Sequence, residues 1–145
     1  MRTLVLALLA AALMAGAAVA QEGGAPPPPS PTVLMNPVAL PIVVDGKLVN
    51  YIFVTLRLRL SPKADSLKMR AMEPYFRDGL VRVAYRTPFV RPDNYAVLDD
   101  DKLKAAVLGQ TAAIAGAGMV TSVQIVREQA QHTSGLPKPT APPRR

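Results

Sequence analysis

The sequence predicts an α+β fold: a three-stranded, mostly antiparallel sheet with two helices on one face, in the order strand-strand-helix-helix-strand. Three observations support this prediction. Two apolar runs that alternate at every second residue flank an Asp-Gly pair, which is typical of a β-hairpin. Two segments with apolar residues at helical spacing come next. A run rich in valine and isoleucine then closes the domain.

The hairpin is predicted from residues 38–44 and 52–60, on either side of Asp45-Gly46. Because successive side chains of a strand point to opposite faces, each run directs one apolar face toward a core. The other face of the second strand carries Tyr51, Phe53, Thr55, Arg57 and Arg59. We expect this arginine face to be solvated or covered by a partner.

A first helical stretch is predicted over residues 62–86, because Ser61-Pro62 offers an N-cap followed by proline at the first helical position. Pro74 lacks a backbone N–H and clashes with the preceding turn, so a kink or break is expected near Glu73. Residues 88–98 are expected to form a connecting loop. The predicted buried stripe consists of Ala64, Leu67, Ala71, Tyr75, Leu80, Val83 and Ala84.

The second helix is predicted to open at residues 99–101, three aspartates that cap free N–H groups and complement the helix dipole. Gly-Ala-Gly at residues 116–118 ends it. Residues 119–127 form the last predicted strand. Its apolar side chains are divided between two faces, with Val123 and Ile125 on one and Val120 and Val126 on the other.

The two ends of the chain differ in composition from its middle. Residues 1–20 are expected to be a signal peptide that exports the protein to the periplasm, or else an uncleaved membrane anchor. Residues 21–32 are proline-rich and predict a semi-rigid linker. The folded unit is expected to span residues 33–131, and residues 132–145 a disordered basic tail.

Composition excludes many kinds of chemistry. The chain has no cysteine and one histidine, so disulfides, thiolate nucleophiles, zinc-cysteine clusters and multi-histidine metal sites are excluded. His132 lies in the predicted tail, where nothing would hold it as a general base. The aspartates at 99–101 lack the spaced ligands and turn glycine of a calcium loop. We therefore expect no catalytic, cofactor-binding or metal-binding residues, and no enzyme activity.

Positive charge is concentrated between Arg57 and Arg91. The whole chain has a formal net charge of +7, and this segment holds nine basic residues against three acidic ones. Nucleic acid is not an expected partner, because the protein is expected to be exported and no aromatic stacking platform accompanies the charge. Three explanations stay open: a solvated helix face, attraction to anionic lipid or cell-wall polymer, and pairing with an acidic protein surface.

Three segments resemble the flagellar basal-body-associated FliL family: residues 51–58, residues 72–81 and residues 120–126. The second contains a proline followed by an Arg-Asp pair, Pro74 and Arg77-Asp78, as in that family. The resemblance covers about residues 38–128. It implies a non-enzymatic periplasmic domain, similar to the stomatin/prohibitin type, that self-associates around the stator of the flagellar motor.

The leading hypothesis is therefore a structural or interaction protein that binds an inner-membrane complex, such as the stator, through its sheet edge and basic helix. The residues expected to contact this partner are Arg57, Arg59, Arg77, Asp78 and Arg82. The alternative is a basic envelope-binding module that adsorbs to anionic lipid or cell-wall polymer and is unrelated to flagella.

Overall fold

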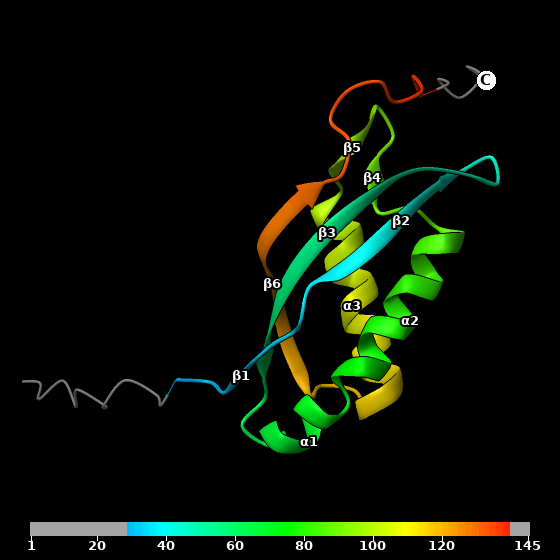
Figure 1. The fold of residues 1–145 in the computed structure, drawn as a ribbon. Coiled ribbons are helices and arrows are strands. Elements are labelled where there is room, and N and C mark those ends of the chain that lie inside the picture. Colours follow the sequence, from blue (N-terminus) through cyan, green and yellow to red (C-terminus); the bar gives the residue numbers. More distant parts are fainter. Residues whose placement is uncertain (1–28, 140–145) are drawn as a thin grey trace, which may run out of the picture.

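One long strand, β3 (Lys47–Leu60), forms the centre of the fold, which Figure 1 shows in the computed structural model. The structure describes residues 29–139. The predicted signal peptide, most of the predicted linker and residues 140–145 lie outside this range. The α+β class is confirmed, since an antiparallel sheet packs against helices on one of its faces. Within the described residues, no helix is long and apolar enough to cross a membrane.

The sheet is three strands wide, as predicted, although it contains four strands. β6 (Val120–Ala130) pairs with one side of β3, and β1 (Thr32–Leu34) and β2 (Val38–Val44) lie one after the other along the other side. Between them, the backbone N–H of Met35 donates to the carbonyl of Leu56 at 2.8 Å. β1 and β2 therefore form one edge of the sheet, interrupted by a short break that the sequence analysis did not predict.

The predicted hairpin between β2 and β3 is confirmed. Asp45 has φ 49° and Gly46 has φ 72°, so both central residues of the turn are left-handed. Two such residues define a type I′ turn, whose twist matches that of the flanking strands, and Asp-Gly is a preferred sequence for it. The turn thereby sets the register that sends the apolar side chains of both strands to the same face.

The core lies between the inner face of β3 and two helices. The inward side chains of β3 from Ile52 to Leu60 are at most 1% exposed. α2 (Glu73–Arg86) and α3 (Asp100–Ala115) cover this face (Figure 1). Both helices repeat their buried positions every three or four residues, as one face of a helix does. These positions are Glu73, Phe76, Leu80 and Ala84 in α2, and Leu103, Val107 and Thr111 in α3.

β6 differs from the prediction in which side chains share a face. Val123 and Ile125 lie opposite the inward-facing Leu58 and Leu56, so they share the inner face, as predicted. Val120 lies opposite Leu60, which also faces inward. The register shifts between Arg59 and Leu60, where an extra residue on β6 forms a bulge. The prediction that placed Val120 on the other face is therefore wrong, because strict alternation fails at a bulge.

The first helical stretch begins later than predicted and is divided. The cap is Asp65, whose Oδ1 accepts from Leu67 N at 2.8 Å and Lys68 N at 3.2 Å, so α1 spans Ser66–Ala71. The Oγ of Ser61, the predicted cap, accepts instead from Lys63 N in a turn. A break separates α1 from α2 at Met72, as Pro74 predicts. The predicted stripe fails in its first part, since Leu67 in α1 is 79% exposed and Tyr75 in the first turn of α2 is 66% exposed.

The predicted loop at residues 88–98 contains a small hairpin of β4 (Val90–Arg91) and β5 (Asn94–Leu98). Both strands are too short, and too close to proline, for alternating apolar and polar residues to be recognised in the sequence. The hairpin is held to the rest of the fold by the N–H of Leu98, which donates to Glu128 Oε1 at 3.1 Å. The segment predicted as a connecting loop therefore contains two paired strands that the prediction did not include.

A buried amide joins β3, β5 and the segment after β6. Asn50 is 3% exposed, and its Nδ2 donates to the carbonyls of Tyr95 at 3.1 Å and His132 at 2.9 Å. Its Oδ1 accepts from the N–H groups of Tyr51 at 2.9 Å and His132 at 3.1 Å. The main chain of His132 is thus fixed to β3, while its side chain is exposed. Residues 133–139 form no helix or strand.

Replacing this amide tests its role in stability. Asn50→Ala leaves buried main-chain groups at Tyr95 and His132 without partners, so the free energy of unfolding should fall by about 3 kcal/mol in urea denaturation. His132→Ala is the matched control, because its main-chain bonds remain; it should change the free energy by less than about 0.5 kcal/mol. Equal effects of the two substitutions would contradict this account of Asn50.

Candidate interaction surface

The outer face of the sheet is the face that α2 and α3 leave open (Figure 1). Arg57 and Arg59 project from β3 on this side, since the residues that alternate with them are buried. Leu34 lies opposite Arg57 on β1, and Gln124 lies opposite it on β6. The Nη1 of Arg57 donates to Gln124 Oε1 at 3.2 Å, which orients the guanidinium along the sheet.

This outer face combines free cations with exposed apolar groups. Among residues 29–139, neither Arg57 nor Arg59 forms an ion pair. Leu34 is 58% exposed and Phe53 is 43% exposed on the same face. Both arginines belong to the central strand, so they lie on a face of the sheet and not at its edge, where the binding hypothesis had placed the contact. Arginine beside exposed aromatic and aliphatic groups is typical of protein interfaces.

The other three predicted contact residues lie on α2, away from this face. Arg77 Nε lies 3.7 Å from Glu73 Oε1, and Arg82 Nη2 lies 2.8 Å from Asp78 Oδ2. Arg77 and Asp78 therefore do not pair with each other; each joins a residue one turn away. The five predicted residues form two separate groups, one on the open sheet face and one on the helix.

Glu73 is a residue that the sequence analysis missed as a structural partner. It is only 7% exposed, and its Oε1 accepts from the N–H of Asn36 at 3.0 Å. Asn36 lies in the break between β1 and β2, so a helix side chain supplies the acceptor that the strand ladder does not. Surface hollows of about 350 and 370 Å³ flank this contact. Pro37, which cannot donate to a ladder, was the sequence signal of the break.

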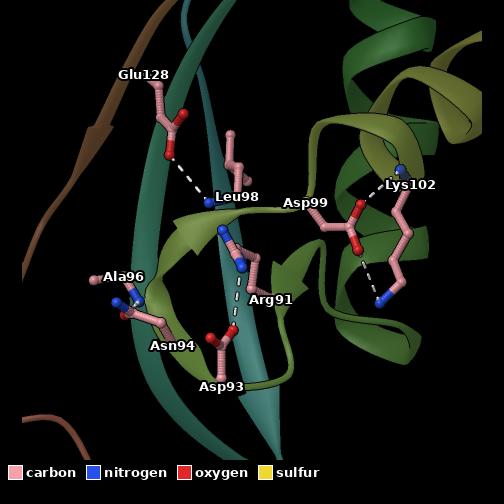
Figure 2. A network of polar contacts seen from close by, with 8 residues as sticks. All are labelled: Arg91, Asp93, Asn94, Ala96, Leu98, Asp99, Lys102 and Glu128. Carbon is pink, nitrogen blue, oxygen red and sulfur yellow. Dashed lines mark hydrogen bonds and ion pairs between the residues drawn. The ribbon is translucent and has the colours of Figure 1, made fainter.

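A second polar cluster lies where β4 and β5 meet the start of α3 (Figure 2). Asp99 caps α3, as predicted, because its Oδ1 accepts from the N–H of Lys102. Its Oδ2 also lies 3.2 Å from Lys102 Nζ. In the adjoining hairpin, Arg91 forms an ion pair with Asp93 at 3.4 Å. The hydrogen bond from the Lys102 backbone lowers the pKa of Asp99, and the Lys102 side chain adds to this effect. Within the described range, no three acidic or histidine side chains are grouped to hold a metal ion.

No protein-family model matches the chain, and no curated protein matches it in sequence. The likeness to the FliL family therefore rests on its three sequence segments. The first segment lies in β3 and the third in β6. The second covers the break at Met72 and the first part of α2. Together they include three of the five candidate contact residues, Arg57, Arg77 and Asp78, while Arg59 and Arg82 lie just outside them.

The contact between Glu73 and the strand break makes a prediction about stability. Glu73→Ala leaves the N–H of Asn36 without its acceptor and Arg77 without its partner, so the free energy of unfolding should fall by about 2 kcal/mol. Asp78→Ala is the matched control, because the pair it breaks with Arg82 is exposed; it should cost less than about 0.5 kcal/mol. Urea denaturation measures both, and a larger loss for Asp78→Ala would contradict the assignment.

The cap of α3 predicts a pH dependence. Because the pKa of Asp99 is lowered in the folded state, its ionised form adds stability above the unfolded pKa of about 3.9, and this contribution is lost as the pH falls through the folded value. Asp99→Asn keeps a capping oxygen but cannot titrate. The difference in stability between the two proteins should be present at neutral pH and shrink in acid. A difference that stays constant down to pH 2 would contradict the role of the charge.

Proposed function

We propose that the chain is a non-enzymatic interaction protein of the bacterial periplasm, resembling the FliL family, that binds an inner-membrane complex such as the flagellar stator. The observation that carries this proposal is the open face of the sheet. Arg57 and Arg59, which form no ion pair within residues 29–139, lie on this face together with exposed Leu34 and Phe53. A folded domain that leaves such a face uncovered offers it to a partner.

The chemistry of this face indicates what kind of partner fits. Each guanidinium can bind a carboxylate with two parallel hydrogen bonds. Leu34, opposite Arg57, and Phe53, four residues before Arg57 on β3, add exposed apolar area on the same face. An acidic protein surface with apolar side chains satisfies both requirements. A purely anionic polymer satisfies only the charges, so exposed Phe53 favours the protein partner. Self-association of the domain around that partner belongs to the same proposal.

Reversing the two charges tests the proposal. A photo-crosslinker at Phe53, in cells with an intact envelope, should join the protein to a component of the motor in the inner membrane. Arg57→Glu/Arg59→Glu should remove this product, because both guanidiniums would be replaced by charges that repel an acidic partner. Lys47→Glu, on the same strand but away from the arginines, is the control and should leave the product unchanged.

Salt separates a specific interface from adsorption. For purified components, the wild-type complex should persist in high salt, since apolar contacts at Phe53 and Leu34 are not screened. Binding that disappears in salt alone, together with recovery of monomer only in the crosslinking experiment, would overturn the proposal and favour the envelope-polymer alternative.

A further inference from the structure

The end of the domain formed by α1 combines exposed cations with one prominent apolar side chain. Lys63, Lys68 and Arg70 are exposed, and Leu67 between them is 79% exposed. Met69 is the one residue of α1 that is buried, so it attaches the helix to the core while its neighbours face outward. At this exposure the Leu67 side chain contributes little to the core and is accessible to a partner.

The cations at this end are available to a partner. In the part of the chain that the structure describes, Lys63, Lys68 and Arg70 form no ion pair. Asp65 is the one acidic residue of the segment 63–70, and its Oδ1 accepts from the N–H groups of Leu67 and Lys68. The segment 63–70 therefore keeps a net positive charge, three basic residues against one acidic residue.

The start of the described chain lies at this same end. The carbonyl of Pro31 accepts from the N–H of Leu60 at 2.8 Å, one residue before the turn that leads to α1. Eleven residues, 21–31, separate this point from the apolar residues 1–20. Even fully extended, that many residues span no more than about 40 Å. If the apolar segment is inserted in a membrane, the domain cannot lie far from the bilayer, and it is attached near α1.

We propose that the α1 end of the domain docks on an anionic lipid bilayer, with Leu67 entering the headgroup region and Lys63, Lys68 and Arg70 contacting lipid phosphates. An apolar side chain surrounded by basic ones is the pattern of an interfacial helix, in which burial and charge attraction add. The long stems of lysine and arginine allow the leucine to enter while their charges stay among the headgroups. This surface differs from the open sheet face, so the two proposals fail independently.

The test uses the full chain, which has no cysteine of its own. Leu67→Cys provides a single site for an environment-sensitive fluorophore. Its emission should shift to the blue on phosphatidylcholine vesicles that contain phosphatidylglycerol, and much less on phosphatidylcholine alone. The same label in Val97→Cys, on β5, is the matched control and should not shift. Because both proteins carry the same N-terminal segment, any insertion of that segment is common to both.

Neutralising the cations tests the electrostatic part. In the labelled Leu67→Cys protein, Lys63→Gln/Lys68→Gln/Arg70→Gln should raise the lipid concentration for the half-maximal shift by roughly a hundredfold, about fivefold per charge. Lys47→Gln/Arg86→Gln/Lys138→Gln removes the same charge from exposed positions elsewhere and should change it by much less. Unchanged urea midpoints would show that all variants fold.

Three results would overturn the proposal. The first is an equal shift at positions 67 and 97, and the second is a shift that does not depend on phosphatidylglycerol. The third is a photo-crosslink from position 67 to a protein in the intact envelope with no shift on vesicles, which would assign this end to an acidic protein partner instead. Loss of the motor crosslink in Arg57→Glu/Arg59→Glu would leave all of these outcomes unaffected.

Discussion

Burial of one side of β3 is the interaction on which the rest of the structure depends. The side chains from Ile52 to Leu60 that face inward are almost completely inaccessible, and β1, β2 and β6 pair with the same strand. α2 and α3 fold onto the surface that this strand creates. Because the period of a strand is two, the burial of one set of side chains fixes the opposite orientation of the other set. The core of the protein thereby determines where Arg57 and Arg59 point.

Signals confined to a few neighbouring residues were read correctly from the sequence. The Asp45-Gly46 turn, the break before Pro74 and the Asp99 cap each depend on backbone preferences of the residues themselves. The alternation of β3 was equally clear, because five inward positions repeat without interruption. The placement of Arg57 and Arg59 on the exposed side of the sheet followed from it.

Features that depend on contacts between distant residues could not be read in this way. Asn50 meets His132 across 82 positions, and Glu73 meets Asn36 across 37. No local pattern shows that a buried amide or carboxylate will find such a partner. The bulge that turns Val120 inward likewise depends on how β6 fits β3. Ser61 and Asp65 both have a side-chain oxygen that can cap a helix, so residue preference alone did not show which of them would begin α1.

The break between β1 and β2 affects how readily the sheet edge pairs with other molecules of the same protein. An open sheet edge exposes a row of N–H and C=O groups that invites strands of other molecules. Here Asn36 donates its N–H to Glu73, and Pro37 has none to offer. Pro41, on the same edge strand, removes another donor. A foreign strand finds no continuous ladder along this edge, so edge-to-edge aggregation is disfavoured there while the face of the sheet stays open.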